Sequence, residues 1–324
     1  MKDRIKVKLK ERTLYNKNTV NKTPPHNIKR ELDTNNFDIK HIKRITRQDK
    51  ETENIYKRQS MQEDYESFFL TNISHEIRTP LNVLYGMTQL IELQLGEGTL
   101  LQDEEKLYEY TGTIKQNCYR LMKLLNNIID IVMIDMGHFE LNEKSCDIVC
   151  IIKDITMAVA NYFKNQHINI TFTSNIDEKI MYFDSDNIKR VMLNLFSNAV
   201  KSTGAYGKIE VSMRDIGTFI LISVKDDGKG ISQDKMDIIF NRFRKSDESL
   251  NRDHEGSGLG LYIAKSIVEL HDGKIWAECE TNKGCEFYIM LPVKMTDTTD
   301  SQPIVNYLIN NNDIINIEFS DIYF

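Results

Sequence analysis

The chain has 324 residues, of which 40% are hydrophobic and 28% are charged, with a formal charge of −6 at pH 7. This is the composition of a soluble globular protein, and the length predicts about two domains with additional segments. No run approaches the roughly 18–20 apolar residues needed to cross a bilayer, and Met1 to Lys10 lacks the apolar core of a signal peptide. The five cysteines form no CxxC pair, so we expect reduced thiols in the cytoplasm. The seven histidines form no cluster with cysteine, which argues against a zinc site.

The first segment in chain order, residues 1–54, is polar and basic. Residues 1–50 hold 15 Lys/Arg against 6 Asp/Glu, a formal charge of +9, which leaves −15 on the rest of the chain. Such a basic arm can bind nucleic acid, a membrane surface or a partner protein. The segment has no hydrophobic period and no signature of a nucleic-acid-binding fold, so we expect a flexible, solvated leader that does not bind nucleic acid.

Two long helices are predicted between residues 55 and 137. In each, apolar residues recur at steps of three and four, which is the spacing of one helix face. Gly96-Glu97-Gly98 separates the helices and predicts a turn. A single antiparallel hairpin has too little surface to cover its own apolar stripe, so residues 55–137 are expected to form a homodimer with a four-helix bundle. The first stripe is Leu70, Ile73, Ile77, Leu81, Leu84, Thr88, Ile91 and Leu95, and the second is Leu107, Tyr110, Ile114, Cys118, Leu121, Leu125, Ile128 and Val132.

After Gly137 the pattern changes to alternating helices and strands. This alternation predicts an α/β sandwich over residues 138–294, with helices on one face of a mixed sheet, and gives the whole chain an α+β class. Residues 295–324 form a C-terminal tail, in which Ile314 to Phe319 would add an edge strand or bind a partner. Helices are expected over 147–164, 187–202, 232–240 and 259–271, and strands over 168–172, 180–183, 209–213, 219–224, 274–277 and 287–291.

His75 is the candidate nucleophile. It lies midway between Ile73 and Ile77, about 200° around the helix from the apolar stripe, so its side chain should face outward. A lone helical histidine is more often a surface residue, but here Pro80 is expected to interrupt the helix, which suggests a site. A neutral imidazole is a competent nucleophile near pH 7, and Glu76 can act as its base or orienting group.

A polar stripe on the helix 187–202 is the candidate nucleotide site. Asp186 is expected to be its N-cap. Asn194, Asn198 and Lys201 are spaced to lie on one face, and asparagine is otherwise a poor helix former. Taken in isolation, the asparagines are better explained as cap-like or solvent-facing amides. The functional interpretation is that the amide oxygens face Mg²⁺ and phosphate, with Lys201 as a point charge for phosphate.

Two glycine clusters follow. Asp226-Asp227-Gly228-Lys229-Gly230 comes directly after a strand, and its glycines would allow a ligand to approach the backbone, with Asp226 as acceptor for the adenine amine. Gly256-Ser257-Gly258-Leu259-Gly260 opens a helix, whose free N–H groups suit phosphates. The segment between the clusters, from Arg244 to Glu255, is predicted to be a mobile lid or a plain surface loop.

In combination, these motifs resemble the sensor histidine kinases of two-component systems. Ser74 to Leu81 is similar to their phosphoacceptor box, and Asn194 to Lys201 resembles their asparagine box. The two glycine clusters resemble their two glycine boxes, and Phe240 to Phe243 resembles their phenylalanine box. Five motifs in the family's order, spread over about two thirds of the chain, are far more specific than any one of them.

The resemblance implies a phosphoacceptor hairpin followed by a Bergerat-type ATP-binding domain. It implies ATP and Mg²⁺ as cofactors, and a separate response regulator receiver domain as the partner whose aspartate takes the phosphoryl group. His75 would be the acceptor, Glu76 the base and Thr79 part of the pattern for phosphatase activity toward that partner. The nucleotide site would comprise Asn194, Asn198, Lys201, Asp226, Gly228, Gly230, Phe240, Arg242, Gly256, Gly258, Leu259 and Gly260, with Asn198 as the metal ligand.

Departures from the family pattern leave these chemical groups intact. Ser202 stands where an aromatic residue is common, and Glu255 and Asp272 stand where glycine is frequent. Two other functions stay open. The chain could be another ATPase of this nucleotide fold, although such proteins lack the hairpin histidine. It could also be a catalytically idle scaffold or a phosphatase of the partner.

Overall fold

The computed structural model describes residues 70–96, 104–242, 257–294 and 311–322. All of them belong to one compact unit, Phe68–Phe324. The predicted basic leader 1–54 lies outside the described residues, as do Gly256 and the predicted lid.

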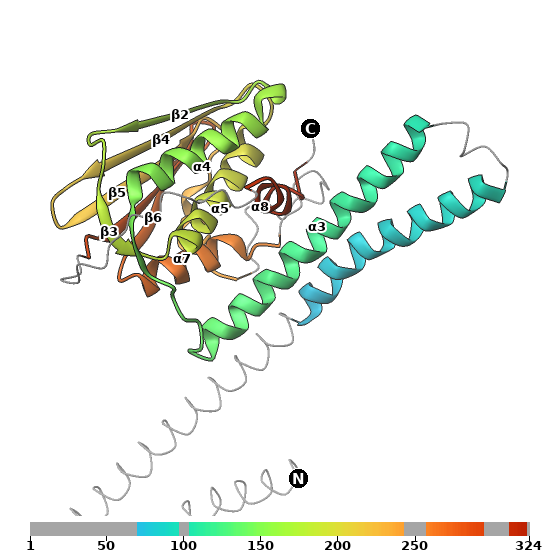
Figure 1. Cartoon of the computed structure of the whole chain (residues 1–324), viewed down its shortest axis with the longest axis horizontal. Helices are drawn as coiled ribbons and strands as arrows, with labels where there is room; N and C mark the ends of the chain where they lie inside the picture. Colours follow the sequence, from blue (N-terminus) through green and yellow to red (C-terminus); the bar gives the residue numbers. More distant parts are fainter. Residues whose placement is uncertain (1–69, 97–103, 243–256, 295–310, 323–324) are drawn as a thin grey trace, which may run out of the picture. The chain divides into compact units, whose positions relative to one another are not determined.

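The helical hairpin expected from the periodicity is present. One helix covers residues 70–96, and α3 (Glu104–Asp135) runs beside it (Figure 1). Near their connection, Gln94 Nε2 donates to Tyr110 Oη at 2.9 Å. The first helix continues through Pro80, so the predicted interruption there is wrong. Because Pro80 is buried, packing of its ring offsets the hydrogen bond that proline cannot donate.

The predicted apolar stripes are only partly covered within the single chain. Leu81 and Leu95 of the first helix are 53% and 51% exposed, and Leu125 of α3 is 57% exposed. The residues that α3 does bury form a different face, and α3 contacts α7 and α8. These are Asn117, Leu124, Asn127 and Ile131.

A five-stranded mixed sheet forms the second part of the fold. Its strand order is β2-β4-β5-β7-β6, with β2 and β4 parallel and the other neighbours antiparallel (Figure 1). Helices α4 (Ile148–Tyr162), α5 (Ser185–Thr203) and α7 (Gly260–Leu270) cover one face. This confirms the predicted α/β sandwich. The strands are β2 (Asn169–Ser174), β4 (Lys208–Asp215), β5 (Phe219–Asp226), β6 (Lys274–Glu280) and β7 (Gly284–Pro292).

The smaller elements differ more from the expectations. A strand that was not predicted, β1 (Lys144–Asp147), pairs antiparallel with β3 (Ile180–Phe183). The helix expected over 232–240 is reduced to the short α6 (Gln233–Met236), and a 3₁₀ turn, η2 (Lys164–Gln166), follows α4. The expected edge strand after Ile314 is wrong, because these residues form helix α8 (Asn311–Glu318).

Helix α5 is the central helix of the core. Its N-cap is Asp184 rather than the predicted Asp186, since Asp184 Oδ1 accepts from the backbone N–H groups of Asp186 and Asn187 at 3.1 and 3.0 Å. Burial acts to raise the pKa of the Asp184 carboxyl, but the donated hydrogen bonds outweigh it and lower the pKa. Eleven of its residues are buried, which fixes the rotation of α5 and hence the direction of its polar stripe. These are Ser185, Ile188, Val191, Met192, Leu193, Asn194, Leu195, Phe196, Ser197, Ala199 and Val200.

Among the residues that the structure describes, no helix combines the length and apolar character that a membrane crossing requires.

Candidate nucleotide site

The polar stripe of α5 lines a pocket together with the loop before α7. Asn194, Asn198 and Lys201 contribute from α5, and Gly258 and Gly260 contribute from the loop and the start of α7. The structure therefore brings together five of the residues predicted to bind nucleotide, which lie about 60 positions apart in the chain.

Asn194 is held in one orientation. Its Nδ2 donates to the backbone oxygen of Arg190 at 3.1 Å, so Oδ1 points the other way, toward Gly260. A Cβ on Gly260 would lie 2.3 Å from Asn194 Oδ1, which explains why glycine stands there. Gly258 has φ +65, a backbone conformation that favours glycine. Since the N-cap of α7, Leu259, makes no side-chain cap, the first N–H groups of this helix are suited to an anion.

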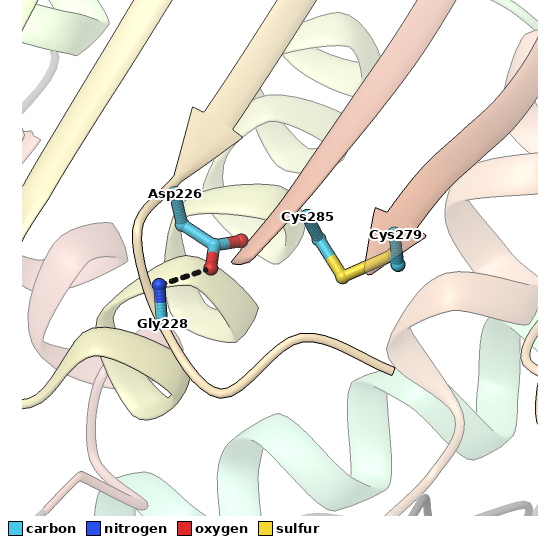
Figure 2. Close-up of a disulfide and its surroundings, with 4 residues drawn as sticks. All are labelled: Asp226, Gly228, Cys279 and Cys285. Carbon is cyan, nitrogen blue, oxygen red and sulfur yellow. Dashed lines mark hydrogen bonds between the residues drawn. A yellow bond between two sulfur atoms is a disulfide. The ribbon is translucent and has the colours of Figure 1, made fainter. Parts of the chain in front are cut away.

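Asp226 lies at the end of β5 and is 3% exposed. Its Oδ1 accepts from the backbone N–H of Gly228 at 3.0 Å, as Figure 2 shows. Burial raises the pKa of the Asp226 carboxyl, and hydrogen bonds from the Gly228 N–H, the Ser202 hydroxyl and the Cys285 N–H act in the opposite direction. A buried acceptor held in place by three donors is suited to recognise an amine such as that of adenine.

Ser202 is a site residue that the sequence interpretation missed. It follows Lys201 directly and hydrogen-bonds Asp226, so it connects the asparagine stripe with the acidic end of β5. A Cβ on Gly228 would lie 2.1 Å from Ser202 Oγ, so the two residues need each other's small size. The sequence did contain a signal for this role, because Ser202 is a small polar residue at a position where the family pattern has an aromatic one.

A disulfide lies beside Asp226 and corrects the expectation that all cysteines are reduced. Cys279 of β6 and Cys285 of β7 are directly opposite in the strand register and are bonded (Figure 2). Among the described residues, Cys118, Cys146 and Cys150 are free thiols. The spacing of six residues gave no signal, because only the β6–β7 hairpin places the two side chains on the same face.

We expect the disulfide to be detectable by thiol labelling. In denaturant without reductant, iodoacetamide should modify three of the five cysteines, and after reduction it should modify all five, as counted by mass spectrometry. Reduction should also lower the free energy of unfolding by about 2 kcal/mol, the chain-entropy value for so short a loop. Five labels before reduction would contradict the bond, and a Cys150→Ser variant serves as the control, with two labels before reduction and four after it.

Phe240 and Arg242 do not line the pocket. Phe240 packs edge-on against Phe287 of β7, with ring centroids 6.5 Å apart. Arg242 Nη1 donates to Asp135 Oδ2 of α3 at 2.7 Å, and its guanidinium lies 4.3 Å from the ring centre of Tyr262. Arg242 therefore joins α3 to the sandwich. Gly230, with φ +67, approaches the backbone of Glu280, where a side chain would not fit.

Lys201 is already paired with a carboxylate. Its Nζ donates to Asp321 Oδ2 at 2.5 Å, and Asp321 lines the same pocket. Burial lowers the pKa of the Lys201 ammonium, and neighbouring Lys123 acts in the same direction, while Asp321 opposes them. No local pattern pointed to this partner, which lies 120 positions further along the chain.

His75, Glu76 and Thr79 lie on the helix 70–96, and none of them lines the pocket. His75 is exposed, as its position off the apolar stripe predicted. Thr79 is exposed too, and its hydroxyl donates to the backbone oxygen of His75 at 3.3 Å. The structure thus has an accessible imidazole on one element and a pocket lined by asparagine, lysine and glycine residues on others.

Known protein families match both parts of the chain. The family described as His Kinase A (phospho-acceptor) domain matches residues 65–137, and the family described as histidine kinase-, DNA gyrase B-, and HSP90-like ATPase matches residues 183–295. Together the two families take in more than half of the chain, in the order expected from the motifs.

Individual proteins give the same result. The chain is 32% identical over 246 residues to Histidine kinase P4 of Formosa agariphila, and 30% identical over 236 residues to the sensor protein kinase WalK of Staphylococcus aureus. These alignments cover 75% and 72% of this chain but 18% and 55% of the two relatives. The structure of full-length ShkA in complex with AMPPNP matches with a TM-score of 0.53 and 26% identity, over 70% of this chain and 46% of that one. The chain belongs to the histidine kinases, and its sandwich is an ATPase domain of that family.

Proposed function

We propose that this chain is an ATP-dependent protein histidine kinase that phosphorylates its own His75 and passes the phosphoryl group to an aspartate of a response regulator receiver domain. The observation that carries the proposal is an exposed His75 on a hairpin helix in the same compact unit as a pocket lined by Asn194, Asn198 and Lys201. Other ATPases of the nucleotide fold lack such a histidine.

The chemical step needs few groups. One imidazole nitrogen of His75 attacks the γ-phosphorus of ATP, the bond from that phosphorus to the bridging oxygen of ADP breaks, and Glu76 takes the imidazole proton. The resulting phosphoramidate is then attacked by the receiver's aspartate, and the histidine nitrogen is the leaving group. Such transfers depend mainly on positioning and on charge stabilisation, which here would come from Lys201 and the N-terminus of α7.

The residues of the pocket fit a magnesium ion. Asn194 Oδ1 is directed toward Gly260, and Asn198 lines the pocket beside it. Ser197, on the same helix turn, has a buried Oγ without a hydrogen-bond partner in the described part of the chain. Oxygen donors of this kind suit Mg²⁺, and we propose Asn198 as its ligand. When bound, the ion neutralises phosphate charge.

A homodimer is proposed from the uncovered side of the hairpin. Apolar side chains on both helices remain exposed in the single chain, in a strip that a second hairpin would cover as a four-helix bundle. The strip comprises Leu70, Ile77, Leu81, Leu95, Leu107, Leu125 and Val132.

We also propose a cytoplasmic location for the protein.

Autophosphorylation with γ-labelled ATP and Mg²⁺ tests the function. The parent chain should incorporate acid-labile label, and His75→Gln should fall to background because glutamine has no nucleophilic nitrogen. His138→Gln, a matched change at another exposed histidine, should retain the parent's label.

Other outcomes have distinct meanings. Label that persists in His75→Gln would mean that another residue is the acceptor. Absence of label in the parent, with ATP still bound, would favour a catalytically idle scaffold or a phosphatase of the partner, the role to which Glu76 and Thr79 would contribute.

A further inference from the structure

Residues 311–322 form a docked segment that lies outside both matched families. Helix α8 contacts α3 and α5, between which it lies in Figure 1. Two apolar side chains of the segment are buried, since Ile315 of α8 and Phe319, which directly follows α8, are each 2% exposed. Phe319 packs against Tyr162 and Phe163, with ring centroids 5.7 and 4.8 Å away. Burial of these two large side chains anchors the segment.

The anchor places one carboxylate between two lysines. Asp321 Oδ2 accepts from Lys201 Nζ at 2.5 Å, and Asp321 Oδ1 accepts from Lys123 Nζ of α3 at 3.1 Å. Lys123 is also 3.1 Å from Glu318 Oε1. Burial acts to raise the pKa of the Asp321 carboxyl, but the two lysines outweigh it and lower the pKa. The carboxylate is therefore ionised at neutral pH.

The carboxylate of Asp321 lies at the pocket in which an anionic ligand would bind. Asp321 lines the same pocket as Asn194, Asn198 and Gly258. A lysine recognises a phosphate as a point charge, and a carboxylate offers it the same charge-assisted hydrogen bond. While Asp321 is bound to Lys201, its carboxylate neutralises the ammonium charge and occupies one of its three N–H donors, so the attraction of Lys201 for a phosphate oxygen is weaker.

We propose that residues 311–322 are an internal competitor of ATP, docked against α3 and α5 with Asp321 in the place of an ATP phosphate. The inference rests on the proposed phosphate-binding role of Lys201. Because Lys123 belongs to the hairpin and Lys201 to the ATPase domain, the same carboxylate also ties the two together. Release of the segment frees the lysine and the pocket at once.

The competition has a measurable size. If the segment is docked in about nine molecules of ten, only a tenth of the protein is competent, and the apparent Kd for ATP is raised about tenfold. Loss of the carboxylate should remove most of this effect, because the segment is tethered and its binding depends on both the apolar anchor and the charge.

Equilibrium titration with a fluorescent ATP analogue such as mant-ATP tests the proposal. The full chain is used with His75→Gln, so that no phosphorylation interferes. Asp321→Asn should bind the analogue about five- to tenfold more tightly than the parent. Asp313→Asn is the matched control, since it removes the same charge from the same segment, and Asp313 contacts Tyr119 of α3 instead of the pocket lysines. The Kd of Asp313→Asn for mant-ATP should equal that of the parent.

A second variant guards against a purely electrostatic explanation. Phe319→Ala leaves Asp321 in the chain but removes the anchor, and it should tighten mant-ATP binding in the same direction. An unchanged or weaker affinity in both Asp321→Asn and Phe319→Ala would overturn the proposal. If affinity rises as expected while the parent incorporates no label at His75, the competitor stands and the proposed kinase activity fails. If the parent incorporates label at His75 while neither variant binds mant-ATP more tightly, the competitor is rejected and the proposed kinase activity stands.

Discussion

Asp226→Asn is expected to weaken ATP binding about a hundredfold, which corresponds to about 2.7 kcal/mol. Asparagine has the shape of aspartate but replaces one carboxylate oxygen with an amino donor and removes the charge. A buried donor facing the amine of adenine would leave both groups without an acceptor, and such mismatches are costly. Mant-ATP titration of the parent and the variant gives the ratio of Kd values directly.

Asp227→Asn is the control for this prediction. Asp227 is the adjacent residue, but it is exposed, and its Oδ1 accepts from the backbone N–H of Lys208 at 2.9 Å. This variant should bind mant-ATP within about twofold of the parent. Circular dichroism should show that both variants are folded. An Asp226→Asn protein that is folded and binds like the parent would remove Asp226 from the adenine site.

Phe196→Ala is expected to lower the free energy of unfolding by about 3–5 kcal/mol. Phe196 is fully buried on α5, among the largest side chains of the core, and truncation leaves a cavity that its neighbours cannot close. Because Asn194 and Ser197 belong to the same helix turn, loosening α5 should also weaken nucleotide binding. Urea denaturation followed by circular dichroism measures the change as a shift in the midpoint at constant slope.

Tyr206→Ala provides the comparison. Tyr206 is also an aromatic residue, but it is 77% exposed, and its ring stacks on that of His167 with the ring centroids 5.1 Å apart. Its loss should cost less than about 1 kcal/mol. Equal losses in the two variants would mean that the burial of Phe196 in the core of the sandwich does not determine stability.

Local patterns were sufficient for most of the regular elements. The long amphipathic periods of the hairpin predicted two helices, and β3 was expected at the residues where it is found, 180–183. The first of the two glycine clusters predicted a close approach to the backbone, and a Cβ on Gly228 would indeed collide with Ser202.

The sequence patterns gave wrong predictions where a contact between residues far apart in the chain determines the local structure. Strand β1 is a run of four mostly polar residues, and it is a strand only because β3 pairs with it from more than 30 positions away. The residues of α8 were predicted to form a strand because Ile314, Ile315 and Ile317 are β-branched. Burial of Ile315, and of Phe319 directly after the helix, favours the helix instead. The continuous helix through Pro80 is a similar case, since burial of the ring outweighs the local preference.

The family, the order of hairpin and sandwich, and five of the residues that line the pocket could be predicted from the sequence. These follow from spacing along the chain, which a helix or a glycine turn converts into geometry within a few residues. The packing of the chain was needed to reveal that Ser202 and Cys285 donate to Asp226, that Cys279 is bonded to Cys285, and that Asp321 reaches Lys201. The physical reason is that ion pairs, disulfides and side-chain hydrogen bonds depend on distance in space, and packing brings together groups whose separation in the chain carries no such information.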